Sequence, residues 1–123
     1  MKTLPNGITI FNATPHAIRF WSPEWPEPIE VESDAIISAE PQEKLSAYLS
    51  EKRFQVVRVA FVGNDEGARI INRAKDEDAD VIVGSIIAAQ AYRGEVYAMC
   101  PCEGYERVPP AEKRMRADKF TAY

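Results

Sequence analysis

Two apolar runs in this chain end in the same arrangement of residues, and this repeat constrains the fold more than any other feature. The segments VAFVGNDEGARII and DVIVGSIIAAQAY each pass from an apolar strand to a glycine, Gly63 or Gly84, then to a small polar residue and a helical pattern. Strands that alternate with helices over short connections are typical of α/β proteins with parallel, right-handed crossovers.

The second half of the chain is therefore expected to form a compact β-α-β-α-β unit. The predicted elements are a buried strand at 54–63, a helix at 64–78, a buried strand at 79–84, a helix at 85–94 and a strand at 95–101. In the first helix, the spacing of Ala68, Ile71 and Ala74 predicts the face that packs against the core.

The first half is expected to begin with antiparallel strands. Residues 8–11 and 17–21 keep a period of two, so Ile8, Ile10, Ile18 and Phe20 are predicted to share one face. A third strand is predicted at 29–33.

The next segment, residues 38–53, has Leu45, Tyr48 and Leu49 at helical spacing. Pro41 is able to occupy the first turn of a helix, so we expect a short helix here.

The sequence thus predicts a single small α/β domain over residues 1–107 and an extended C-terminal arm over residues 108–123. The arm is polar, locally basic and interrupted by two consecutive prolines. Its aromatic residues Phe120 and Tyr123 would lie exposed on a free terminus, and aromatic residues are enriched at interfaces. We therefore expect the arm to pack across a second subunit in a homo-oligomer; the alternative is a frayed tail.

Charge and cysteine content limit the partners and the compartment. The formal net charge is −4, which disfavours broad binding to nucleic acid or to an anionic membrane, because both need a cationic field. No apolar run approaches the roughly 20 residues that cross a bilayer. The only cysteines, Cys100 and Cys102, are too few for a secreted disulfide scaffold, so we expect reduced thiols and a cytoplasmic location.

The two strand-to-helix loops are the first candidate binding residues. If the strands are parallel, Gly63 and Asn64 lie at the same sheet edge as Gly84 and Ser85, where open α/β sheets bind ligands. Free N–H groups at helix N-termini favour anions such as phosphate. The alternative is that both glycines only permit tight turns.

The single histidine lies in the turn FNATPH, which supplies the second group of candidates. Asn12 and Thr14 are residue types that bond nearby backbone and start turns, and Pro15 restricts the chain before His16. The turn therefore fixes the direction of His16, which is either structural, a ligand contact or a catalytic base. We expect Asn12, Thr14 and His16 to contribute to a ligand site.

Other patterns predict no metal or cofactor. Cys100 and Cys102 with one residue between them are at most half of a zinc site. The acidic run at 76–80 lacks the glycine and the distal glutamate of a calcium loop and is read as a solvated turn. Trp21 and Trp25 either form an aromatic face for a ligand or cover a sheet edge, and we favour the second interpretation.

The opening ITIFNATPHAIRFW resembles that of a widespread group of small phage and prophage proteins, which begin with a strand and an N-x-T-P-H turn. VIVGSIIAAQAY and EVYAMCP match the alanine-rich helix and the Val-rich strand that follow in the group. The proline-rich middle is outside the resemblance, and the C-terminus departs from it. The resemblance implies a phage accessory protein, and several compact phage proteins sequester nucleotide-derived immune signals without cleaving them.

Three functions follow as hypotheses. The first is a non-enzymatic sponge for a nucleotide-like ligand. The second is a protein–protein inhibitor or interaction module that acts on a host factor through the C-terminal arm. The third is a small nucleotide phosphodiesterase or hydrolase.

Overall fold

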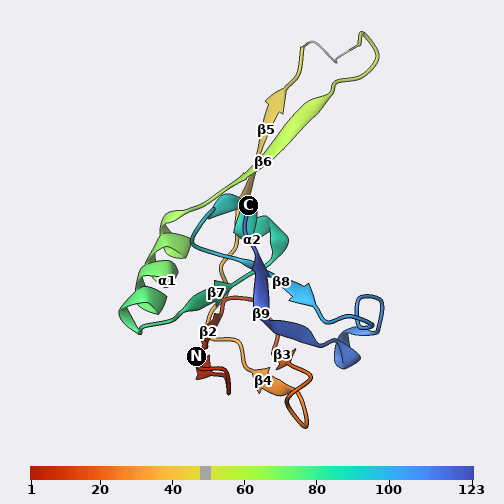
Figure 1. The fold of residues 1–123 in the computed structure, drawn as a ribbon. Helices are drawn as coiled ribbons and strands as arrows, with labels where there is room; N and C mark the ends of the chain where they lie inside the picture. Colours follow the sequence, from red (N-terminus) through yellow and green to blue (C-terminus); the bar gives the residue numbers. More distant parts are fainter. Residues whose placement is uncertain (48–50) are drawn as a thin grey trace.

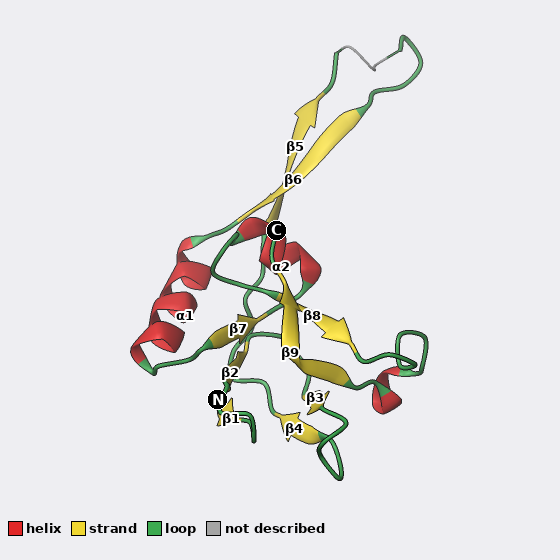
Figure 2. Ribbon diagram, viewed as in Figure 1, coloured by secondary structure: helices red, strands yellow, loops and turns green. Residues whose placement is uncertain are grey.

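The computed structural model describes residues 1–47 and 51–123, which form a layered body and one protruding hairpin (Figure 1). In chain order the elements are β1 (Lys2–Thr3), β2 (Thr9–Asn12), β3 (Ile18–Trp21), β4 (Ile29–Val31), β5 (Glu40–Leu45), β6 (Val57–Val62), α1 (Asp65–Asp76), β7 (Val81–Val83), α2 (Ile86–Ala91), β8 (Ala98–Pro101), the 3₁₀ turn η1 (Pro110–Glu112) and β9 (Met115–Thr121). The mixture of strands and helices confirms the α/β class (Figure 2).

The first sheet has the strand order β1-β2-β7. β1 runs antiparallel to β2, whereas β2 and β7 are parallel, with Phe11 opposite Ile82 and Asn12 opposite Val83. Successive side chains of a strand point to opposite faces, so Phe11 and Ile82 share one face and Ile10 and Val83 share the other. These four side chains are buried, so both faces of the β2–β7 pair are covered, whereas β1 is exposed.

Two core clusters fill the space on either side of the first sheet. One contains Phe11 and Ile82 together with residues of α1 and α2, and the other contains Ile10 with Phe20 of β3 and Ala117 of β9. The helices therefore cover one face of the first sheet, and a second sheet covers the other. Alternating apolar residues of β2 and β3 meet in the second cluster, as the period of two predicts.

The second sheet has the order β4-β3-β9-β8. β3 is antiparallel to β4 and parallel to β9, and β9 is antiparallel to β8. The strands predicted at 17–21 and 29–33 are β3 and β4, which confirms their antiparallel pairing. The expected antiparallel pairing of the strands at 8–11 and 17–21 is wrong: β2 and β3 do not pair with each other, because the turn between them carries the chain from one sheet to the other.

The helices begin at the small polar residues that follow the two glycines. The side chain of Asn64 accepts a hydrogen bond from the amide of Gly67 at the start of α1, and the hydroxyl of Ser85 accepts one from the amide of Ala88 in α2. The buried face of α1 contains Gly67, Ile71 and Ala74. Ala68, which helical spacing assigned to that face, is exposed instead.

The helix predicted at 38–53 is wrong for the residues that the structure describes. Residues 40–45 form β5, which pairs antiparallel with β6 from Glu40–Val62 to Leu45–Val57. Tyr48 and Leu49 of the predicted helix lie outside the described residues. β6 is rich in the strand formers Val and Phe, and the β5 segment, which lies close in the sequence, supplies a partner for its backbone at the entropic cost of closing the intervening loop.

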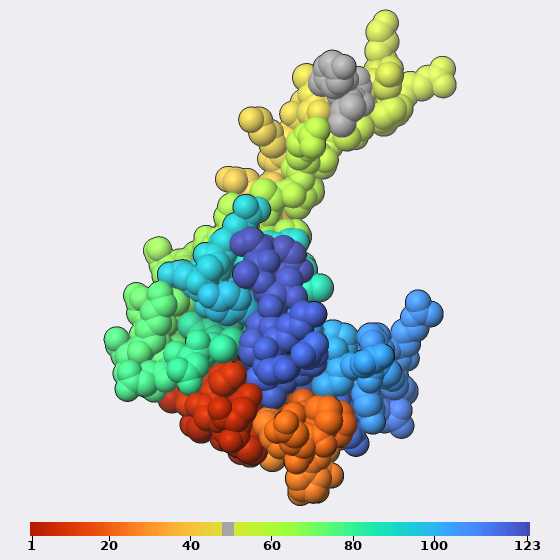
Figure 3. Space-filling model, viewed as in Figure 1, coloured from red at the N-terminus to blue at the C-terminus, as the bar shows by residue number. Residues whose placement is uncertain are grey.

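The prediction that β6 is buried is also wrong. The β5–β6 ribbon, residues 40–45 and 57–62, projects from the body, and neither core cluster contains any of its side chains (Figure 3). Val59 is 50% exposed. β6 is thus a largely exposed apolar strand whose main contact with the body, within the described residues, is with α2, a case that hydrophobicity alone does not distinguish from a buried strand.

The predicted parallel pairing of the β-α-β-α-β unit differs from the observed pairing. The order β6, α1, β7, α2, β8 is confirmed, but β6 pairs with β5, β7 with β2, and β8 with β9. β7 meets the segment before β8 only at one parallel bridge, between Val83 and Tyr97. Sequence order therefore predicts the elements, whereas their neighbours come from more distant segments.

Residues 108–123 do not form an extended arm. They contain η1 and β9, and β9 lies between β3 and β8 inside the second sheet. Phe120 packs against the second core cluster, with its ring centroid 6.3 Å from that of Phe20. The burial that an oligomer was expected to provide for Phe120 is thus supplied by the chain itself.

Within residues 1–47 and 51–123, neither α-helix has the length and apolarity needed to span a membrane.

Candidate functional site

The predicted turn at Asn12–His16 is a satisfied structural turn. Asn12 is completely buried, and its Nδ2 donates to the carbonyl oxygens of His16 at 2.8 Å and Val31 at 3.0 Å. Its Oδ1 accepts from the amide of Thr14 at 3.0 Å and lies 2.7 Å from the Thr14 hydroxyl. The polar groups of Asn12 and Thr14 are thus occupied by hydrogen bonds within the protein. The neighbouring His16 is exposed.

The Gly63–Asn64 loop is held by Tyr92 at the end of α2. The Tyr92 hydroxyl accepts from the amide of Asn64 at 2.8 Å. A Cβ built on Gly63 would lie 2.5 Å from a ring carbon of Tyr92, and one on Gly67 would lie 1.9 Å from its hydroxyl oxygen. Gly63 therefore allows close packing of a buried tyrosine, which occupies the space above this loop.

The Gly84–Ser85 loop is equally close-packed. A Cβ on Gly84 would lie 2.6 Å from a methyl group of Val96. The amide of Gly84 is bonded to the carbonyl of Tyr97 at 3.0 Å, and the Ser85 hydroxyl caps α2. The predicted alternative, in which the glycine permits a tight turn, describes the geometry of this loop.

The two predicted loops do not converge. Ser85 precedes α2 and Tyr92 follows it, so the Gly84–Ser85 loop and the Tyr92-bound Gly63–Asn64 loop lie at opposite ends of this helix. At 1.5 Å per residue these ends are about 10 Å apart. The shared sheet edge requires β6 and β7 to be parallel neighbours, and β6 belongs to a different sheet.

Cys100, Cys102 and the acidic run at 76–80 form no common site. Both cysteines are free thiols, and among the described residues no group of three or more His, Cys, Asp or Glu side chains is arranged to hold a metal ion. Asp78 has a left-handed backbone conformation, φ 61°, in the turn before β7. Trp25 packs against the second core cluster.

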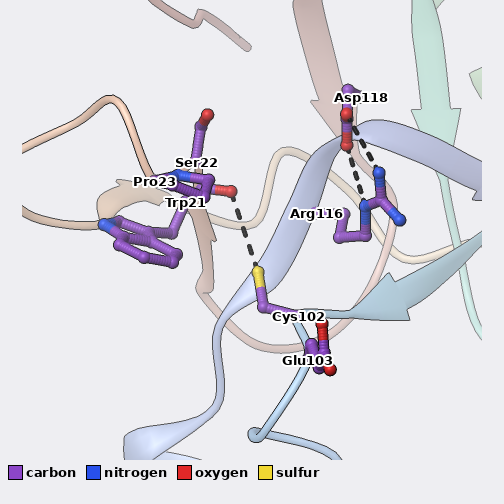
Figure 4. A pocket seen from close by; sticks show the side chains of 7 residues that line it. All are labelled: Trp21, Ser22, Pro23, Cys102, Glu103, Arg116 and Asp118. Atoms are coloured by element: carbon purple, nitrogen blue, oxygen red, sulfur yellow. Dashed lines mark hydrogen bonds and ion pairs between the residues drawn. The ribbon is translucent and has the colours of Figure 1, made fainter.

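One cavity of about 430 Å³ lies between the end of β3 and β9 (Figure 4). Its lining residues are Trp21, Ser22, Pro23, Cys102, Glu103, Arg116 and Asp118. Arg116 donates two hydrogen bonds to Asp118, at 3.0 and 3.1 Å, and these bonds lower the pKa of Asp118 and raise that of Arg116. Burial raises the pKa of the Cys102 thiol.

The charge of this cavity disfavours an anionic ligand. Its single cation, Arg116, is already bound to Asp118, and Glu103 adds a second carboxylate. A phosphate entering here would lack a free cationic partner and would face uncompensated negative charge.

A second region lies beside β3, β4 and the segment that leads into β9, and its lining contains more cations than acids. Two adjoining hollows of about 330 and 290 Å³ share Arg19 and Ala111 in their linings. The cations that line them are Arg19, Lys113 and Arg114, which we call the basic cluster; Glu30 and Glu112 are the acids. In the part of the chain that the structure describes, none of the three cations forms an ion pair.

Two aromatic rings hold one member of the basic cluster, Arg114, in place. The Arg114 guanidinium lies 4.9 Å from the ring centroid of Trp21 and 4.9 Å from that of Tyr105. Cation–π contacts orient the guanidinium without using its N–H groups, which stay available to a ligand. Arg19 lies opposite Glu30 in the β3–β4 ladder without a contact within ion-pair distance.

The sequence contained only indirect signals of the basic cluster. The only such signal is the local excess of Lys and Arg near the C-terminus. Because β9 pairs with β3, Lys113 and Arg114 lie next to Arg19 on the surface. Of the predicted site residues, His16 is nearest in the chain, because its neighbour Ala17 lines the larger hollow.

Comparison of the chain with models of known families, with curated proteins and with solved structures finds no match.

Proposed function

We propose that this protein binds, without cleaving it, a small anionic ligand with an aromatic ring, such as a nucleotide-derived signal. The observation that carries the proposal is the convergence of Arg19, Lys113 and Arg114, free of ion pairs within the described residues, on two adjoining hollows. Arginine guanidinium groups bind phosphate through paired hydrogen bonds, and Lys113 adds a point charge.

An aromatic residue in the lining supports the ring of the ligand. Tyr105 lines the smaller hollow beside Arg114, and nucleobases stack on aromatic side chains. The two hollows are each about 300 Å³, the lower end of the range for small-molecule sites. Their described linings include no cysteine, serine, threonine or histidine, which supports binding over hydrolysis through a thiol, hydroxyl or imidazole nucleophile.

The ligand site of this proposal replaces the one expected at Gly63, Asn64, Gly84 and Ser85, whose atoms serve packing and capping. The phage origin and the role as an anti-defence sponge remain part of the proposal, supported by the resemblance of the N-terminal segment. Because this resemblance rests on sequence alone, it is unaffected by the move of the proposed ligand site to the basic cluster.

Thermal unfolding with a ligand panel tests the proposal. We expect Tm to rise with nucleoside diphosphates, cyclic dinucleotides or ADP-ribose, because a ligand at 100 times its Kd stabilises the fold by about 2.7 kcal/mol. Inorganic pyrophosphate and free nucleosides distinguish the contributions of charge and ring. Chromatography of the ligand after incubation measures cleavage.

Matched variants locate the binding. Arg19→Gln and Arg114→Gln should remove most of the ligand-induced shift, whereas Arg69→Gln, which changes an exposed arginine on α1, should retain it. No shift with any member of the panel would overturn the proposal, and so would equal loss in all three variants. Detection of a cleaved product would show that the protein hydrolyses the ligand and would overturn the proposal of binding without cleavage.

A further inference from the structure

The β5–β6 ribbon turns backbone groups toward solvent along both of its edges. The amide of Ser46 donates to the carbonyl of Val56 at 2.8 Å, so these two residues form a hydrogen-bonded pair next to the strands. Hydrogen-bonded and non-hydrogen-bonded pairs alternate along an antiparallel ladder. The register therefore directs the N–H and C=O groups of Val57, Val59 and Phe61 to the outer edge of β6.

The two edges of the ribbon are protected to different extents. The outward residues of β5 are Pro41, which has no N–H group, Glu43 and Leu45. Prolines and charges on an edge strand prevent pairing with another chain. The outer edge of β6 has neither, and β5 is its sole partner strand among the described residues.

The same residues give the ribbon an apolar face. Cross-strand partners share a face, so Leu45 and Val57 lie beside Val59 and Phe61, with Glu43 as the one charge. Leu45 is 52% exposed and Val59 is 50% exposed. A two-stranded ribbon of this kind is only marginally stable alone in water, and a further strand stabilises it.

We propose that β6 pairs antiparallel with β6 of a second copy of this chain about a two-fold axis at Val59. Val59 lies opposite Val59 of the second copy, and Val57 lies opposite its Phe61. All the outward groups of β6 then find partners, since each such pair exchanges two hydrogen bonds. Aromatic and β-branched residues form favourable cross-strand pairs, and the product is a four-stranded sheet, β5-β6-β6-β5.

Charge selects this register over its neighbours. With Val59 on the axis, Arg58 lies opposite Ala60 of the second copy. A shift of one residue per strand toward the tip places Arg58 opposite Arg58 of the second copy, and like charges that face each other directly are destabilising. A shift toward the body puts Ala60 on the axis and leaves Val57 without a strand partner.

The length of the ribbon brings further apolar surface into the dimer. Phe54, which is 56% exposed near the tip, becomes level with residue 64 of the second copy, where α1 begins. Exposed Ile86 and Ile87 lie on α2, which packs against β6.

Light scattering of paired proline variants tests this inference, which is independent of the ligand proposed above. The full chain should have twice its monomer mass of 13.8 kDa. Val59→Pro removes only an outward N–H group and should give a monomer. Glu43→Pro removes the outward N–H group of the residue paired with Val59 and should remain a dimer.

Disulfide trapping gives a second measurement that does not depend on proline tolerance. In a Cys100→Ser/Cys102→Ala background, Val59→Cys should form an intermolecular disulfide, because paired residues on the axis have Cα atoms about 5.5 Å apart. Glu43→Cys should not. A monomeric full chain, a dimeric Val59→Pro variant, or equal trapping of the two cysteine variants would overturn the inference.

Discussion

At the residue scale, the best-defined feature is a buried amide. Asn12 is shared between two segments, since it bonds its own turn and the carbonyl of Val31 on β4. A buried polar side chain with all its partners is stabilising, but the loss of one partner leaves others unsatisfied in a medium without water. Asn12 therefore connects the first sheet to the second.

We expect Asn12→Ala to lower the free energy of unfolding by about 3 kcal/mol, because it removes the partners of Val31, His16 and Thr14 backbone groups. His16→Ala should change it by less than about 0.5 kcal/mol, because that residue is exposed. Urea unfolding measures both. Equal effects of the two variants would contradict the structural role of the turn.

At the element scale, α1 and α2 meet through Tyr92 and the glycines that it covers. Tyr92 ends α2, is buried, and bonds the N-cap residue of α1. The hydroxyl occupies the space where a side chain at position 67 would lie. One tyrosine thus fixes the start of α1 against the end of α2, and the absence of a side chain at Gly67 is required for that contact.

Gly67→Ala tests this packing by the sign of its effect. Helix propensity alone predicts stabilisation by up to about 1 kcal/mol, since glycine is a poor helix former. The overlap with Tyr92 predicts destabilisation by about 1–3 kcal/mol instead. Asn72→Ala, at an exposed position of the same helix, is the control and should stabilise slightly. Thermal unfolding that shows a more stable Gly67→Ala variant would refute the contact.

At the scale of the whole molecule, the C-terminal strand joins the ends of the chain. β9 lies between β3 and β8, and the carbonyl of Ala117 accepts from the side chain of Asn6 at 2.9 Å. Residues more than a hundred positions apart therefore contact each other. Contacts of this kind close the second core cluster only after β9 has been made, and such long-range contacts are associated with slow folding.

Removal of residues 109–123 should abolish the cooperative fold, because it takes β9, one of the two central strands, out of the second sheet and uncovers Phe20. Removal of residues 122–123, which follow β9, should leave Tm within a few degrees. Near-ultraviolet circular dichroism and thermal unfolding compare the two. A truncated chain that keeps a sharp transition would show that the strand is dispensable.

The local features of this protein could be predicted from its sequence. The starts of α1 and α2 at Asn64 and Ser85, the strand β7 and the polar turn at Asn12 follow from capping preferences, apolar periodicity and turn chemistry. Each depends on residues within a few positions of one another, so the sequence contains the whole physical cause.

Only the tertiary structure decided which strands are neighbours and what the polar residues do. An apolar strand such as β6 has the same pattern whether it is buried or projects into solvent, and β9 reads as a tail until β3 and β8 enclose it. The basic cluster likewise joins Arg19 to Arg114 across a long sequence separation. Strand pairing minimises the exposed backbone and apolar surface of the whole chain. Every segment contributes to this minimum, so it cannot be predicted from the pattern of any one segment.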